Sequence, residues 1–145
     1  MYSMVKRVSV FALALLTLIM GVVVPYRRAE AAIMYNNVTN AYMNCSIDSS
    51  NQLHASLTAL GIKGTTSSIK AEVYVEKRIL GLFWTRVDIG YPNNTWTDST
   101  TSYTYNNVFS TQLSTGVTYR VTATFTVSGD GGADDVIVKT ATLSN

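Results

Sequence analysis

Residues 117–128 read Val-Thr-Tyr-Arg-Val-Thr-Ala-Thr-Phe-Thr-Val-Ser, and this stretch decides the fold of the chain. Its odd-numbered positions are all apolar, whereas its even-numbered positions hold only Thr, Arg and Ser. Successive side chains of a strand point to opposite faces, so this alternation predicts a strand with one buried and one solvated face.

Six further segments repeat every two residues in the same way, and turn residues separate them. Two of these turns are Asp48-Ser49-Ser50-Asn51 and Gly129-Asp130-Gly131-Gly132. No window carries a helical apolar stripe. Seven short strands in about 110 residues predict one all-β domain, an antiparallel sandwich. The apolar positions of the six segments lie within 41–47, 53–59, 69–75, 83–89, 103–109 and 136–143.

A motif directly before the deciding strand specifies the kind of sandwich. Leu113-Ser114-Thr115-Gly116-Val117-Thr118-Tyr119 has the spacing L-x-x-G-x-x-Y. It resembles the tyrosine corner of fibronectin type III and related immunoglobulin-like domains, where the tyrosine ring enters the core and its hydroxyl binds upstream backbone. The resemblance covers residues 113–127 and implies a single immunoglobulin-like (fibronectin III-like) β-sandwich of about seven strands. The second strand lacks the Trp that many fibronectin-type modules carry there.

A second resemblance extends over most of the chain after residue 63. It is carried by residues 64–69, residues 73–77, Trp84 with Val87, and residues 116–121. Together these segments resemble an uncharacterised family of small secreted proteins from Gram-positive bacteria. The resemblance implies a secreted β-sandwich and brings no catalytic residues with it.

Residues 1–31 have the pattern of a signal peptide that forms an N-terminal helix. Lys6 and Arg7 precede an apolar run of 17 residues, Val8–Val24, and Ala29-Glu30-Ala31 fits the A-x-A cleavage pattern. The run is shorter than the about 20 residues of a spanning helix. Arg27 and Arg28 follow it, which leaves open an uncleaved N-terminal membrane anchor. Export of the remainder is expected in either case.

Cleavage would leave a domain of 114 residues, 32–145, whose charge differs from that of the whole chain. The chain carries +2, but residues 32–145 hold seven Lys and Arg against eight Asp and Glu, a net charge of −1. This balance gives no electrostatic reason to bind nucleic acid, or a membrane once the leader is removed. The single cysteine, Cys45, excludes an intrachain disulfide and is expected to pack as a small apolar residue, with an intermolecular disulfide as the alternative.

Catalytic residues are scarce in this sequence. His54 is the only histidine, and a Ser-His-Asp arrangement would require it. It lies within a strand on the parity of Ser56 and Thr58, which favours a solvated strand residue. Cys45 falls on the opposite parity, so a Cys–His pair is disfavoured. We therefore expect no catalytic residues, no cofactor and no enzyme activity.

One carboxylate cluster is a candidate metal site. Asp130, Asp134 and Asp135 surround Gly131-Gly132, and Ca²⁺ prefers oxygen ligands on a flexible loop. Gly-Asp-Gly-Gly between two strands is also ordinary hairpin chemistry, and the loop lacks the alternating carboxylates of an EF-hand. We expect a hairpin and no metal.

Aromatic residues supply the candidate binding surface. Trp84 falls on the polar parity of its strand, and other rings lie in or near the Asn-, Thr- and Ser-rich connection of residues 90–106. Exposed rings stack on sugars or anchor protein partners. The alternative is that they pack across strands or cover a sheet edge. The candidate binding residues are Trp84, Tyr91, Trp96, Tyr103 and Tyr105.

These observations predict a secreted, non-catalytic module that binds a glycan, the cell envelope or a protein. A secreted effector or bacteriocin-like protein is the alternative function, and a small hydrolase is the third.

Overall fold

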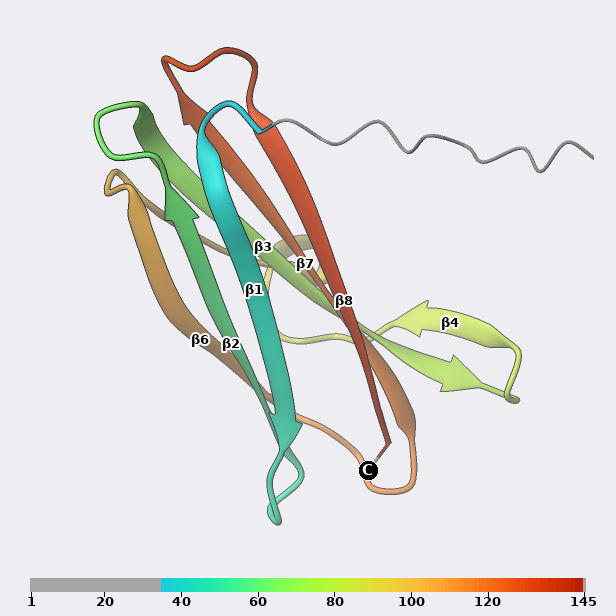
Figure 1. Ribbon diagram of the computed structural model, residues 1–145. Coiled ribbons are helices and arrows are strands. Elements are labelled where there is room, and N and C mark those ends of the chain that lie inside the picture. Colours follow the sequence, from blue (N-terminus) through green and yellow to red (C-terminus); the bar gives the residue numbers. More distant parts are fainter. Residues whose placement is uncertain (1–34, 145) are drawn as a thin grey trace, which may run out of the picture. The chain divides into compact units, whose positions relative to one another are not determined.

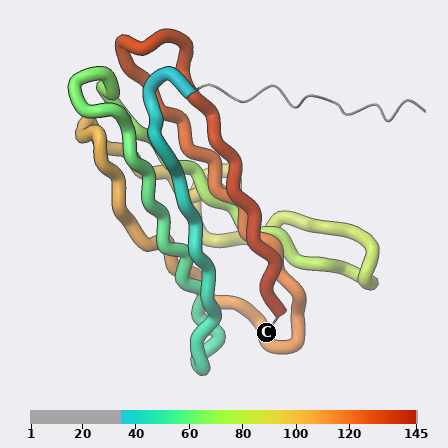
Figure 2. Tube along the Cα trace, viewed as in Figure 1, coloured from blue at the N-terminus to red at the C-terminus, as the bar shows by residue number. Residues whose placement is uncertain are grey.

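The computed structural model describes residues 35–144, which form an all-β domain of two antiparallel sheets (Figure 1 and Figure 2). The first sheet has the strand order β1-β2-β6, and the second has the order β4-β3-β7-β8, with β5 also paired to β3. The predicted all-β sandwich is confirmed. The bounds are β1 Val38–Ile47, β2 Gln52–Gly61, β3 Thr66–Ile79, β4 Phe83–Arg86, β5 Trp96–Thr100, β6 Thr104–Gln112, β7 Thr118–Gly129 and β8 Asp135–Ser144, with a short 3₁₀ turn, η1, at Pro92–Asn94.

The predicted signal peptide, residues 1–31, lies outside the described residues, as do its cleavage site and the alternative membrane anchor. Within residues 35–144, no helix has the length and apolar character needed to cross a membrane.

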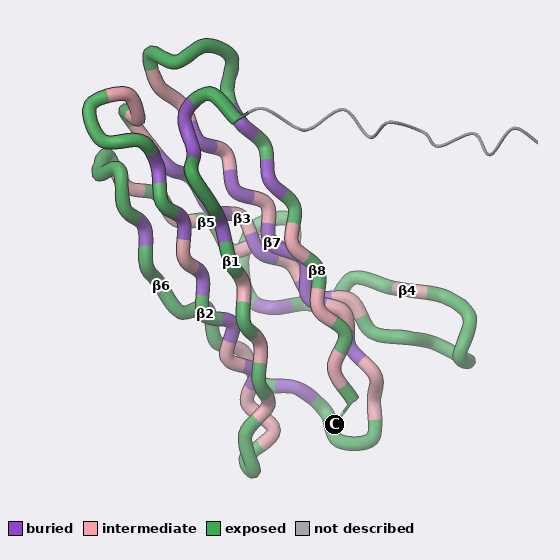
Figure 3. Tube along the Cα trace, in the orientation of Figure 1, coloured by how far each residue is buried: buried purple, intermediate pink, exposed green. Residues whose placement is uncertain are grey.

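Strand β7 shows the predicted alternation and carries much of the core. Tyr119, Val121, Ala123, Phe125 and Val127 are all buried. Fully burying an aliphatic or aromatic side chain of this size stabilises the fold by about 1.5–3 kcal/mol. Figure 3 shows the buried positions alternating with exposed ones along the strands of both sheets. The facing and neighbouring core residues are Leu53, Ala55, Leu57 and Ala59 of β2 with Ile69, Ala71, Val73 and Val75 of β3.

The tyrosine-corner geometry appears as predicted at the start of β7. The Tyr119 ring is buried, and its hydroxyl accepts a hydrogen bond from the Ser114 N–H at 2.9 Å and donates to the Ser114 carbonyl at 3.2 Å. Leu113 is buried, and Gly116 has a φ of 73°, a backbone conformation that favours glycine. The motif therefore fixes the chain between β6 and β7.

A buried polar clamp joins the start of β1 to the β7–β8 connection. The Asp135 carboxylate accepts hydrogen bonds from the backbone N–H groups of Asn36, Asn37 and Val38, at 2.6 Å from Asn37 and 3.0 Å from Val38. The fully buried Asn37 side chain accepts from the Gly131 N–H and donates to the Ala133 carbonyl, each at 3.0 Å. Asp135, the first residue of β8, thus satisfies backbone donors, and the segment between β7 and β8 is a hairpin connection as expected.

Three details depart from the sequence pattern. Phe83 was assigned to the buried parity of its segment, but its side chain is 65% exposed because β4 extends past the edge of the facing sheet. Strand β5 lies where a connection was expected. Cys45 is only half-buried against the core, and that burial raises the pKa of its thiol to about 11.

Candidate functional site

The structure places Tyr105 in the core, so its predicted exposure is wrong. Its side chain is 3% exposed, and its hydroxyl donates to Asp98 Oδ2 at 3.0 Å. Asn107 Nδ2 donates to the same oxygen at 2.6 Å and holds the pKa of Asp98 below its usual value. Burial, followed by the Asp98 contact, raises the pKa of Tyr105. Tyr105 is therefore a structural residue that links β6 to β5.

Tyr91 and Trp96 gather on one buried ring, Phe109. The Trp96 and Phe109 ring centroids are 5.5 Å apart, and Tyr91 meets Phe109 edge-on at 6.5 Å. Trp96 is half-buried against the core, whereas Tyr91 keeps 45% of its surface exposed. This pair mainly covers the margin of the core. Tyr103, 37% exposed, lies apart from it in the β5–β6 turn.

Trp84 lies on the outer face of the second sheet, on the side opposite to the core. It pairs with Arg78 across the β3–β4 hairpin, and Arg78 has the same outward parity as Glu76. The guanidinium of Arg120 lies 4.5 Å from the Trp84 ring centroid and that of Arg78 lies 5.9 Å away. Such contacts contribute about 0.5–1 kcal/mol at exposed sites. The Trp84 ring is therefore already engaged by two cations.

A further cation–aromatic contact, between Arg86 and Tyr74, lies on the same face of the sheet. The guanidinium of Arg86 lies 3.5 Å from the ring centroid of Tyr74 and donates to Thr95 Oγ1 at 3.0 Å. Arg120 forms an ion pair with Glu76 at 2.8 Å, and the hydrogen bond that its guanidinium donates to Glu76 raises the pKa of Arg120. We call Tyr74, Glu76, Arg78, Trp84, Arg86 and Arg120 the arginine–aromatic ladder.

The five predicted rings therefore do not form one surface. Trp96 pairs with the buried Val73 and has the inward parity of its sheet, whereas Trp84 faces outward. Tyr105 is buried, and Tyr91 packs beside Trp96 on the buried ring of Phe109. Trp84 remains the predicted residue that belongs to an exposed constellation.

The most exposed apolar residues of the domain lie next to Trp84, and the sequence analysis missed them. We call residues 79–83 the hairpin tip. Figure 1 shows the β3–β4 hairpin projecting from the body of the sandwich, and Figure 3 shows its end as exposed. Leu80, Leu82, Phe83 and Ile79 are 85%, 73%, 65% and 38% exposed. A contiguous apolar group at a projecting point marks an interaction site or an aggregation hazard.

The turn at the tip has an unusual residue in its first central position. The Leu82 N–H donates to the Ile79 carbonyl at 3.0 Å, and φ is 51° at Leu80 and 70° at Gly81. Positive φ at both central residues is typical of a type I′ turn, which prefers Asn-Gly. The left-handed region costs an ordinary L-residue about 1–2 kcal/mol. Leu80 therefore opposes the conformational preference of its own turn.

The hairpin is also strongly basic. Residues 77–86 contain Lys77, Arg78 and Arg86 and no acidic residue. Among residues 35–144, the ion pairs are His54–Asp48, Lys70–Glu72 and Arg120–Glu76, and none involves these three cations. The net charge of −1 for residues 32–145 thus conceals a basic hairpin on an acidic body.

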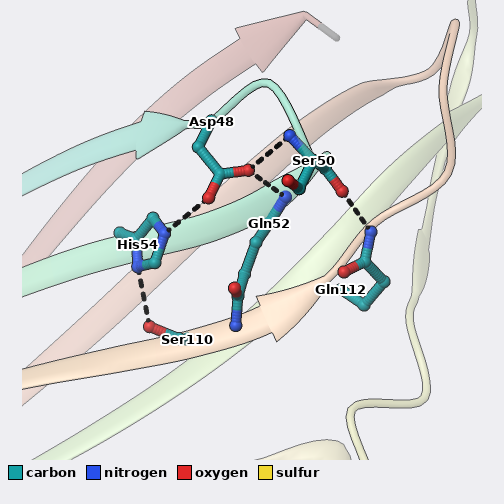
Figure 4. A network of polar contacts seen from close by, with 6 residues as sticks. All are labelled: Asp48, Ser50, Gln52, His54, Ser110 and Gln112. Atoms are coloured by element: carbon teal, nitrogen blue, oxygen red, sulfur yellow. Dashed lines mark hydrogen bonds and ion pairs between the residues drawn. The ribbon is translucent and has the colours of Figure 1, made fainter.

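A chain of contacts between Ser110, His54 and Asp48 lies on the first sheet, next to the β1–β2 turn, and Figure 4 shows these residues. His54 Nε2 lies 3.1 Å from Asp48 Oδ2, and His54 Nδ1 lies 3.0 Å from Ser110 Oγ. The sequence placed His54 on a solvated face, and its side chain is 38% exposed. Ser110 is its direct cross-strand partner on β6.

The surroundings of this chain favour a structural role. Asp48 Oδ1 accepts the backbone N–H groups of Ser50 and Gln52, which closes the β1–β2 turn. The Gln52 N–H and then the His54 side chain hold the pKa of Asp48 below its usual value. A serine hydrolase also needs donors aimed at an oxyanion and a site sheltered from water. Here the three side chains lie on the open outer face of a sheet.

Comparisons with known proteins assign no family. No protein-family model matches the chain, and no curated protein matches it. Among solved structures, a protein from Archaeoglobus fulgidus is similar over 74% of this chain and 97% of its own, with 14% identity and a TM-score of 0.34. That likeness is too weak to bear on fold or function.

Proposed function

We propose that this protein is an exported, non-catalytic binding module that engages its partner through the β3–β4 hairpin. One observation carries the proposal: four apolar side chains are exposed at a projecting tip whose turn contains a leucine at positive φ. Strain and exposure of this kind at one point are typical of functional sites, because neither contributes to folding. The signal-peptide pattern of residues 1–31 supports export.

The strand order supports an immunoglobulin-like assignment within this proposal. In the lettering used for such domains, β1, β2 and β6 take the places of A, B and E in one sheet, and β3, β7 and β8 take those of C, F and G in the other. The hydrogen-bonded Tyr119 hydroxyl adds to this assignment. In such domains the connections between strands carry binding, which suits the β3–β4 hairpin. The secreted family of Gram-positive bacteria stays a proposal that rests on sequence resemblance.

The test compares hairpin and control variants of the full chain on arrayed glycans, cell-wall fragments and membranes from Gram-positive cells. Leu80→Asn removes the most exposed apolar side chain and suits the turn. Val138→Thr is the control, because it replaces a methyl group by a hydroxyl at an exposed apolar residue of β8, 57% exposed, away from the hairpin. We expect retention by at least one of these materials, lost with Leu80→Asn and kept with Val138→Thr. Equal retention of the two variants would refute the hairpin as the binding element.

A second candidate function, a small serine hydrolase, is favoured by the Asp48–His54–Ser110 contacts alone. It predicts turnover of an activated ester by the full chain that disappears with Ser110→Ala and persists with Ser56→Ala on the same sheet. Turnover that survives Ser110→Ala, or none above the buffer rate, would leave these contacts as turn and cross-strand packing.

A further inference from the structure

We propose that the hairpin tip inserts into the surface of a bilayer containing anionic phospholipid. This inference rests on the proposed function, because it names the partner that the same hairpin binds. It departs from the expectation based on net charge, which gave no reason for membrane binding.

The distribution of charge is the first argument. Residues 77–86 carry +3, and since residues 32–145 carry −1 in total, the remainder carries −4. The nearest acidic residue on β3, Glu76, is neutralised by Arg120 at 2.8 Å. Asp88, just beyond β4, uses Oδ1 to accept the Gly90 N–H. An anionic surface would therefore attract the hairpin and repel the body, which orients the domain tip-first.

The order of residues along the hairpin is the second argument. Ile79 and Phe83 form the last pair, Arg78 and Trp84 the next, and Glu76 with Arg86 lies two pairs further back. At strand rise these positions are about 3 Å and about 10 Å behind the last pair. Interfacial segments bury their apolar part about 5–10 Å into the boundary between headgroups and acyl chains.

The side-chain types match the depths that this order gives them. Leu80 and Leu82 would enter the acyl region, and Trp84 would lie at the interface where Trp is enriched. Lys77 and Arg78 have long side chains whose charged ends reach the headgroups while their stems stay in apolar surroundings. Of the four tip side chains, only Phe83 has a ring and none has a hydrogen-bonding group, which disfavours a glycan as the partner.

Tryptophan fluorescence tests the insertion at a defined residue. The chain has two tryptophans, Trp84 on the hairpin and Trp96 half-buried against the core, and none in residues 1–31. The full chain is added to vesicles of equal parts phosphatidylserine and phosphatidylcholine with brominated acyl chains. We expect quenching of the emission, which is largely lost in Trp84→Phe. Vesicles of phosphatidylcholine alone are expected to give little quenching.

Matched variants measure what the tip contributes to partitioning, and they keep any contribution of residues 1–31 constant. Leu80→Asn is expected to weaken partitioning into the anionic vesicles by about tenfold, the effect of withdrawing one largely buried leucine. The double variant Lys77→Gln/Arg78→Gln is expected to weaken it by at least about tenfold and to reduce its salt dependence. Val138→Thr is expected to partition like the parent chain.

Each other outcome overturns the inference. Equal quenching of Trp84→Phe and the parent would show that another segment enters the bilayer. No quenching in either vesicle, with Leu80-dependent retention on cell-wall fragments or a membrane protein, would refute the lipid partner and leave the proposed function standing. If Leu80→Asn changes neither the retention nor the partitioning into vesicles, both the proposed function and this inference are refuted.

Discussion

Two hairpin connections of the second sheet are built on opposite principles. The β7–β8 connection, residues 130–134, contributes Gly131 and Ala133 to the clamp around Asn37 and Asp135. Gly131 lies so close to the segment before β1 that an added Cβ would come within 2.2 Å of the Asn36 carbonyl oxygen. The β3–β4 connection, residues 80–82, exposes two leucines and holds Leu80 at a φ of 51°.

The difference distinguishes residues that stabilise the fold from residues that are free to contact another molecule. The first connection satisfies buried polar groups and fastens the start of β1, and these contacts stabilise the fold. The second has a turn residue that opposes its own backbone conformation and apolar surface left in water. Substitutions of the clamp residues at the first connection should therefore destabilise the domain, and substitutions in the second connection should leave it folded.

The largest expected effect falls on the core of the sandwich. Phe125 is fully buried on β7, with its ring 6.4 Å from that of Tyr105. Phe125→Ala should lower the free energy of unfolding by about 3–5 kcal/mol, since it removes the ring and leaves a cavity. Urea unfolding followed by circular dichroism measures this. A loss below about 1 kcal/mol would mean that Phe125 is not in the core.

The clamp should give the next largest effect. Asp135→Ala removes the acceptor of three backbone N–H groups, two of them in buried contacts, and should cost about 3 kcal/mol. Asp134→Ala is the control, because Asp134 is exposed in the same loop. Its unfolding midpoint should stay close to that of the parent chain. Equal effects of the two variants would contradict the clamp.

The tyrosine corner should give a smaller effect. Tyr119→Phe keeps the ring and removes the hydroxyl that bonds the Ser114 N–H and carbonyl, which should cost about 1 kcal/mol. Tyr103→Phe serves as the comparison, since Tyr103 is exposed in a turn, and its effect should stay within about 0.5 kcal/mol. Matching melting temperatures for both variants and the parent would count against the corner.

The sequence predicts the interior of this fold well because the interior obeys a local rule. Alternation placed the inward residues of β2, β3 and β7 correctly, and the spacing from Leu113 to Tyr119 predicted a contact between residues five apart. Both signals depend on near neighbours in the chain. They gave less in residues 90–106, a stretch rich in Asn, Thr and Ser, where β5 was not predicted and Tyr105 was placed outside.

The candidate site was predictable only in part. Trp84 was identified from its parity, but its contact with Arg120 depends on the register of β3 with β7, which alternation does not give. Phe83 continues an alternating pattern, which predicts a core position. Only the structure reveals that β3 and β4 extend beyond the facing sheet, so that the same parity faces solvent there. A leucine-glycine-leucine turn between two basic residues was the overlooked signal.

The stability of Leu80→Asn tests the central claim most directly, namely that the hairpin tip is not kept for folding. Urea unfolding of the full chain is compared between this variant and the parent. Asn suits the first central position of a type I′ turn, so the free energy of unfolding should be unchanged or raised by up to about 1 kcal/mol. A decrease of about 1 kcal/mol or more would show that Leu80 supports the fold, and would contradict the account.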